Sequence, residues 1–122
     1  MKIIILGKKT KFEENKYKKF AQQIIKQYNN RLFNTSKVLN IVLVDDSYTM
    51  KLNKKFLNKN RPTDVLAFLL NEEVWAEIYI SKDRAKSQAR QRKITQGEEI
   101  CNLIKHGILH LLGYSHQAMK RL

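Results

Sequence analysis

The chain has 122 residues, enough for one hydrophobic core, so we expect a single domain over residues 1–122. Hydrophobic residues make up 43% of it, as in an ordinary globular protein, and no apolar run approaches the roughly 18 residues that a membrane span needs. One cysteine, Cys101, excludes an internal disulfide, so we expect a cytoplasmic protein with no membrane contact.

The net charge of +13 favours a polyanionic partner, of which RNA and DNA are the commonest. Lysine outnumbers arginine, and the codon bias of an A/T-rich genome would produce part of that charge without selection for binding. A membrane surface is the alternative partner, but the sequence contains no basic amphipathic helix with a wide aromatic face. We therefore expect nucleic acid.

The first part of the chain predicts a strand, a helix and a second strand. Residues 2–6 are a short apolar run that Gly7 closes. Residues 12–28 carry apolar side chains at helical spacing, residues 29–36 are a turn-rich break, and residues 38–44 are a β-branched strand. The side chains that we expect along the buried stripe of the helix are Phe12, Tyr17, Phe20, Ile24, Ile25 and Tyr28.

The middle of the chain predicts a helix followed by two strands. Asp45, Asp46 and Ser47 offer N-cap residues for a helix over 48–57, and a loop follows at 58–62. Strands are predicted at 63–70 and 74–80. In the second strand, Trp75, Glu77 and Tyr79 should share one face, with Val74, Ala76, Ile78 and Ile80 on the other.

Two further helices are predicted near the C-terminus. Ser81 caps a basic helix over 82–93, and Thr95 caps a last helix that runs to about residue 112. This last helix is apolar nearly all round, so we expect it to be buried in the middle of the fold. These helices with a sheet of about four strands predict an α+β (α/β-like) domain.

All three histidines lie in residues 106–116. His106 and His110 are four apart, so they share one face of a helix, and Gly113 can end that helix so that His116 returns toward them. Three imidazoles suit Zn²⁺ and leave a fourth position for water, as in a catalytic site, although other transition metals also accept them. The alternative is that the histidines only line a core.

The histidine spacing is similar to the metzincin peptidase pattern His-Glu-x-x-His-x-x-Gly-x-x-His. Gly107 stands where those peptidases have the glutamate that acts as general base, so a peptidase mechanism does not follow. Gly107 would instead allow close approach of a substrate or of another backbone, and a helix crossing that needs a small residue explains it equally well.

Residues 106–116, which read His-Gly-x-Leu-His-Leu-x-Gly-Tyr-x-His, resemble the signature of the YbeY family of bacterial metal-dependent endoribonucleases. Leu52-Asn53 and the Pro-Thr-Asp-Val-Leu-Ala-Phe block at 62–68 are similar to two other blocks of that family. The resemblance implies a zincin-like small mixed sheet with a central helix that carries two ligands of one Zn²⁺. It also implies RNA, chiefly ribosomal RNA, as substrate, with ribosomal small-subunit proteins and assembly GTPases as partners.

The family resemblance and the order of the chain also suggest catalytic residues beside the metal ligands. His106 is both ligand and catalytic candidate, and Glu77 stands near the position of a family aspartate. For Asp64 and Glu77 alike, the alternative is a strand-end carboxylate that pairs with a lysine, and we favour that alternative for Asp64. The resemblance implies an arginine active in RNA cleavage at the position of Leu57, and Lys59 or Arg61 is the expected substitute unless both are ordinary loop charges.

Three functions remain open at this point. The first is a metal-dependent, single-strand-preferring endoribonuclease for maturation and quality control of small-subunit ribosomal RNA. The second is an RNA-binding ribosome-assembly factor with a structural or vestigial metal site, which Leu57 favours. The third is a metal-dependent hydrolase of another substrate, such as an amide, against which Gly107 and the net charge argue.

Overall fold

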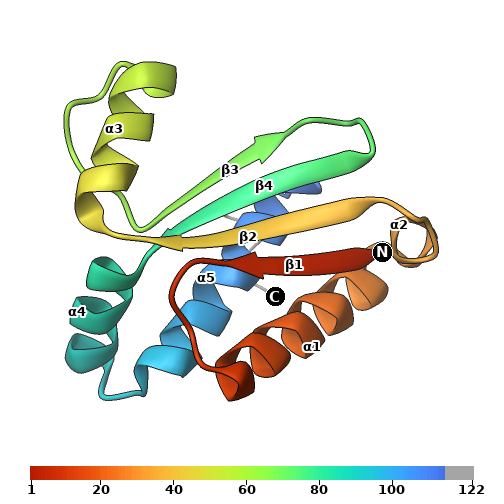
Figure 1. The fold of residues 1–122 in the computed structure, drawn as a ribbon, viewed down its shortest axis with the longest axis horizontal. Coiled ribbons are helices and arrows are strands. Elements are labelled where there is room, and N and C mark those ends of the chain that lie inside the picture. The colour runs from red at the N-terminus through yellow and green to blue at the C-terminus, as the bar shows by residue number, and fades with distance from the viewer. Residues whose placement is uncertain (115–122) are drawn as a thin grey trace.

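A four-stranded mixed sheet forms the centre of the computed structural model, which describes residues 1–114 (Figure 1). The strand order is β1-β2-β4-β3, with β1, β2 and β4 mutually parallel and β3 antiparallel to β4 at one edge. The strand bounds are β1 Lys2–Leu6, β2 Val38–Val44, β3 Val65–Leu69 and β4 Val74–Ser81.

Five helices accompany the sheet in the described part of the chain, and the sequence predicted all of them except α2 (Asn30–Phe33). They are α1 Lys11–Tyr28, α2 Asn30–Phe33, α3 Asp46–Leu57, α4 Lys82–Arg92 and α5 Gln96–Leu111. Helix α1 packs on β1 and on α5, and α5 in turn packs on β3, β4 and α4 (Figure 1). The mixed α+β architecture with a four-stranded sheet is as predicted.

Strand alternation separates the two faces of the sheet. The register pairs Ile5 with Ile41 and Ile41 with Ile78, and all three are almost fully buried in the core. Because neighbouring residues of a strand point to opposite faces, Asn40, Val42, Glu77 and Tyr79 lie on the other face, where they are only half-buried. The core therefore lies between one face of the sheet and the helices α1 and α5.

Two expectations about apolar residues are wrong. Phe12 is 77% exposed, because five residues turn a helix by about 500° and carry Phe12 well away from the stripe that contains Tyr17. Trp75 lies in the buried core with Ala76 rather than beside Glu77, because a register shift opposite Val38 and Leu39 adds one residue to β4.

Helix termini follow local capping chemistry. Helix α3 begins two residues earlier than expected because Asp45 is its N-cap and accepts a hydrogen bond from the Tyr48 N–H at 2.8 Å. Helix α2, which the turn-rich composition concealed, is capped by the Asn29 side chain. Thr95 caps α5 as predicted, accepting from the Glu98 N–H at 3.1 Å.

Helix α5 is buried over most of its length but not all round. Ile104, Ile108 and Leu109 are in the interior, whereas Asn102 and His110 are exposed. One face of α5 is thus open to solvent, and that is the face that carries the histidines. No helix within residues 1–114 is long and apolar enough to cross a membrane.

Candidate active site

A cleft of about 740 Å³ opens beside the edge strand β3. Its walls are the end of α3, the loop from α3 to β3, β3 itself and the exposed face of α5. The lining residues include Asn53, Leu57, Lys59, Arg61, Asp64, His106, Gly107 and His110. Four of the residues predicted for the site, namely His106, His110, Lys59 and Arg61, therefore share one cavity.

The histidine wall of the cleft is built as the spacing predicted. His106 is half-buried and His110 is exposed, one helical turn apart. After them Gly113 takes a left-handed φ of +92°, its N–H donates to the His110 carbonyl at 3.0 Å, and the Tyr114 N–H donates to the Leu109 carbonyl at 3.0 Å. This Schellman pair ends α5 and turns the chain directly after the second histidine.

The donor chemistry of the cleft fits a transition metal in part. Two imidazoles on one helix face are a usual half of a zinc site. Within residues 1–114 no group of three metal-ligating side chains is assembled. The third expected ligand, His116, lies outside the described residues, so the full ligand set stays a prediction.

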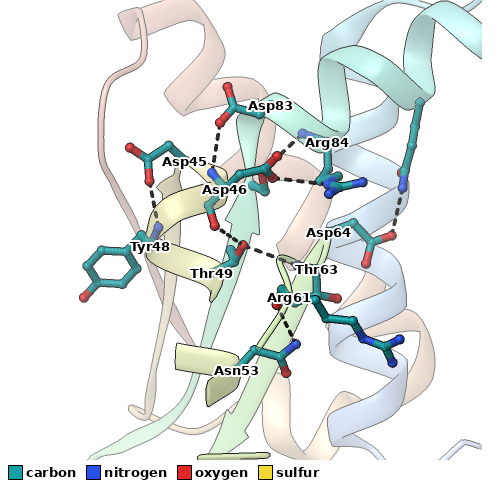
Figure 2. A network of polar contacts seen from close by, with 12 residues as sticks. Asp45, Asp46, Tyr48, Thr49, Asn53, Arg61, Thr63, Asp64, Asp83 and Arg84 are labelled. Atoms are coloured by element: carbon teal, nitrogen blue, oxygen red, sulfur yellow. Dashed lines mark hydrogen bonds and ion pairs between the residues drawn. The ribbon is translucent and has the colours of Figure 1, made fainter. Parts of the chain in front are cut away.

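The loop that carries Lys59 and Arg61 forms the basic wall of the cleft. Two buried polar residues of α3, Thr49 and Asn53, hold this loop in place (Figure 2). The Asn53 Nδ2 donates to the Arg61 carbonyl at 2.9 Å, and the Asn53 carbonyl accepts from the Lys59 N–H at 3.2 Å. The Thr49 hydroxyl accepts from the Thr63 N–H at 3.4 Å. These bonds fix the backbone of the loop that carries the two basic side chains.

Thr49 and Asn53 had not been predicted as site residues. They are two small polar side chains four apart on one helix face, a pattern that propensity treats as solvent-exposed. The signal that could have found them is their proximity to a proline-containing loop with many backbone groups that need partners.

A second polar network braces the start of α3 (Figure 2). The Asp46 carboxylate accepts from the Ser81 hydroxyl at 2.7 Å and from the Arg84 Nε at 3.3 Å. The Asp46 N–H donates to the Asp83 carboxylate at 2.9 Å. Hydrogen bonds therefore hold the start of α3 against the end of β4 and against α4, and α3 in turn forms one wall of the cleft.

Asp64 is the acidic side chain among the lining residues of the cleft. Its Oδ2 accepts from the Gln88 Nε2 at 3.2 Å, and its carbonyl accepts from the Ser81 N–H at 2.9 Å. Within residues 1–114 the structure shows no lysine paired with Asp64, in contrast to the expectation. The carboxylate is oriented by the neutral Gln88 amide instead.

Glu77 is not brought to the histidines. Its neighbour Ile78 packs against α5, so strand alternation places Glu77 on the opposite face of the sheet. There it accepts from the Asn40 amide at 3.4 Å and from the Tyr79 hydroxyl at 3.2 Å. Burial, with the nearby Glu77 charge, raises the pKa of Tyr79 to about 12. The structure therefore places Glu77 away from His106 and His110, contrary to the expectation that it shares their site.

Gly107 allows a close helix–sheet contact. A Cβ built on it would lie 3.0 Å from the Ile78 Cγ2 and 3.1 Å from its Cδ1, both tighter than ordinary van der Waals contact. The helix-crossing explanation is thus supported by direct geometry, although Gly107 also contributes backbone to the cleft.

Comparison with known proteins connects this cleft to a family. The sequence profile described as "Endoribonuclease YbeY" matches residues 3–121. The chain belongs to the YbeY family. Curated relatives named endoribonuclease YbeY include one from Aquifex aeolicus, 35% identical over 95% of this chain and 78% of its own length. Another, from Thermotoga maritima, is 35% identical over 96% of this chain and 75% of its own.

A solved structure agrees with this assignment at the level of fold. The solution structure of TM1509 from Thermotoga maritima is 34% identical, covers 93% of this chain and 74% of its own, and superposes with a TM-score of 0.63. The resemblance seen in residues 52–53, 62–68 and 106–116 is therefore part of a similarity to YbeY proteins over nearly the whole chain.

The structure locates Leu57, where this chain departs from the arginine that the family resemblance implies. Leu57 ends α3, is 50% exposed and lines the cleft. An apolar side chain thus stands at the cleft position where the family resemblance implies an arginine. Lys59 and Arg61 line the same cleft and supply positive charge within four residues of it.

Proposed function

We propose that this protein is a metal-dependent endoribonuclease that prefers single-stranded RNA and acts in the maturation and quality control of small-subunit ribosomal RNA. The observation that carries the proposal is one cleft with two imidazoles on one wall and two cationic side chains on the other. The endoribonuclease names of its YbeY relatives and the net charge of +13 support it.

His106, His110 and His116 are proposed to hold one Zn²⁺ per chain, with other transition metals as possible occupants of the same donor set. The ion would supply a Lewis acid and a bound water whose pKa is lowered to about 7. Arg61 and Lys59 would bind the phosphates on either side of the scissile bond and neutralise their charge. Asp64 replaces Glu77 as the carboxylate positioned to accept a proton or to orient a histidine.

The second candidate is an RNA-binding ribosome-assembly factor with a structural or vestigial metal site. Leu57 favours it, because a half-exposed leucine in the cleft cannot clamp a phosphate. Ribosomal small-subunit proteins and assembly GTPases are proposed partners under either function. The two candidates differ in one property, which is whether bound RNA is cut.

The test is cleavage of a single-stranded ribosomal RNA fragment by purified protein, with and without chelator. The metal content is measured on the same preparation by plasma mass spectrometry. His110→Ala is expected to lose both metal and cleavage. Because His110→Ala is purified in the same way, it also controls for a contaminating nuclease. Gln91→Ala, at an exposed position on α4, is the control for substitution as such and should behave as wild type.

Loss of cleavage with chelator and in His110→Ala alone would support the endoribonuclease. Metal-loaded wild-type protein that binds RNA without cutting it would support the assembly factor. Cleavage that survives in His110→Ala would overturn the role proposed for the histidine wall.

A further inference from the structure

Four aromatic side chains form a continuous row outside the core, on α3, β3 and β4. The rings of Phe56 and Phe68 are 5.2 Å apart between centroids, those of Phe68 and Tyr79 are 6.0 Å apart, and Tyr79 stacks on Tyr48 at 5.9 Å. We call these four residues the aromatic row. It lies on the sheet face opposite α1 and α5, since Phe68 pairs with Glu77 in the register.

The aromatic row is open to solvent at both ends. Phe56 is 55% exposed and Tyr48 is 43% exposed, while Phe68 and Tyr79 between them are half-buried. On the same helix Thr49 and Asn53 are buried instead. Helix α3 therefore directs two small polar residues inward and leaves large aromatic rings at the surface, the reverse of what burial of apolar area would select.

The aromatic row is continuous with the cleft. Phe68 belongs to both, since it also lines the cleft, and Phe56 directly precedes the cleft residue Leu57. A chain that lies along the row would therefore enter the cleft at the end of α3.

Positive charge flanks the aromatic row. Lys51, Lys54 and Lys55 are all exposed on α3, and the Lys55 ammonium lies 5.3 Å from the Phe56 ring centroid. Exposed rings next to ammonium groups match a single nucleic-acid strand, whose bases stack on aromatic faces while its phosphates contact the cations. An acidic protein segment would meet the charge but would have no need of ring faces.

We propose that the aromatic row binds unpaired RNA bases by stacking and delivers the strand to the cleft. This inference rests on the proposed function, because it assigns the path of the same RNA substrate. Phe56 and Tyr48 would stack on bases, and the α3 lysines would hold the phosphates between them. The preference for single strands then has a structural source, since paired bases present no free face to the rings.

The test compares binding of a fluorescein-labelled single-stranded oligoadenylate with binding of heparin, a polyanion without bases. Phe56→Ala and Tyr48→Ala are each expected to weaken oligoadenylate binding about fivefold to a hundredfold and to leave heparin binding unchanged. Phe56→Tyr should restore binding, whereas Phe56→Leu, which keeps an apolar side chain without a ring, should not. Phe12→Ala, at a 77% exposed aromatic on α1, is the matched control and should bind as wild type.

The outcomes separate this inference from the proposed function. If wild type binds and cuts RNA while the Phe56 and Tyr48 variants bind as wild type, the aromatic row is not the path and the endoribonuclease remains. If Phe56→Leu binds oligoadenylate as tightly as wild type, the ring is not needed and base stacking on the aromatic row is overturned. If wild type binds no RNA, both proposals fall. Circular dichroism and thermal unfolding of each variant establish that it is folded.

Discussion

The Asn53 side-chain amide donates a 2.9 Å hydrogen bond to the Arg61 carbonyl, across eight residues of chain. Asn53 is 3% exposed, and its backbone carbonyl accepts a hydrogen bond from the Lys59 N–H. A single buried asparagine thus holds the backbone beside both cationic side chains of the cleft.

Asn53→Asp should release this loop, because a carboxylate cannot donate to the Arg61 carbonyl and repels it. We expect a loss of about 1–3 kcal/mol in the free energy of unfolding, faster tryptic cleavage after Lys59, and weaker RNA cleavage. Urea denaturation and limited proteolysis measure the first two effects. Asn60→Asp makes the same change at an exposed position of the loop and should change none of them; equal effects in both variants would argue against the role given to Asn53.

Leu57→Arg should place a guanidinium in the cleft, where it can bind a phosphate in bidentate fashion. We expect RNA cleavage to rise about tenfold or more, since a hydrogen bond to a charged group contributes about 1.5–3 kcal/mol. Steady-state kinetics on a single-stranded fragment will show whether kcat or KM changes. Leu69→Arg adds the same charge at an exposed β3 residue that does not line the cleft. An equal gain there would mean that only the net charge matters.

Alkaline pH should destabilise the fold through Tyr17 and Tyr79. Burial, with minor help from neighbouring carboxylates, raises the pKa of each to about 12. The unfolded chain releases these protons near the ordinary phenolic pKa of about 10. The stabilisation is therefore complete below about pH 10 and is lost as the pH rises toward 12. Urea midpoints between pH 9 and 12 should fall more steeply for wild type than for a Tyr17→Phe/Tyr79→Phe variant, and parallel curves would contradict the assignment.

Arg92→Met should destabilise the packing of α4 on α5. The Glu99 carboxylate is 1% exposed, and its Oε1 accepts from the Arg92 Nη1 and the Asn102 Nδ2, both at 3.1 Å. Removing the arginine leaves a buried charge with one fewer partner, which should cost about 1–3 kcal/mol in the free energy of unfolding. Arg90→Met, at an exposed position of the same helix, is the control and should cost much less. Thermal unfolding of the two variants measures this difference. Equal losses of stability in both would argue against a structural role for the Arg92–Glu99 ion pair.

Most of the fold could be predicted because its strands and long helices bury continuous apolar stripes. The strands at residues 38–44 and 74–80, and the last helix, agree with the structure within a residue or two. Helix α2 could not be predicted, since four residues held by an asparagine cap carry no periodicity. Trp75 was misplaced because an extra residue in one strand breaks the two-residue alternation, and the sequence does not mark where that occurs.

Lys59 and Arg61 were expected in the site through the family resemblance, whereas the residues alone predicted the site only where its geometry is local. His106, His110 and the turn at Gly113 depend on one helix and its end, so their spacing was sufficient. Glu77 could not be placed from the sequence, because strand alternation separates two faces of the sheet but does not say which face packs against α5. Asn53 and Thr49 were missed because their partners lie 8 and 14 residues away in the next loop.

The contact between Gly107 and Ile78 explains in structural terms why a peptidase-type general base does not fit at position 107. A peptidase of similar histidine spacing would need a glutamate at position 107. In this protein that side chain would begin from a Cβ 3.0 Å from the Ile78 side chain, where a glutamate would be crowded against the sheet. The position that carries the general base in those peptidases is thus occupied in this protein by the packing of α5 on β4.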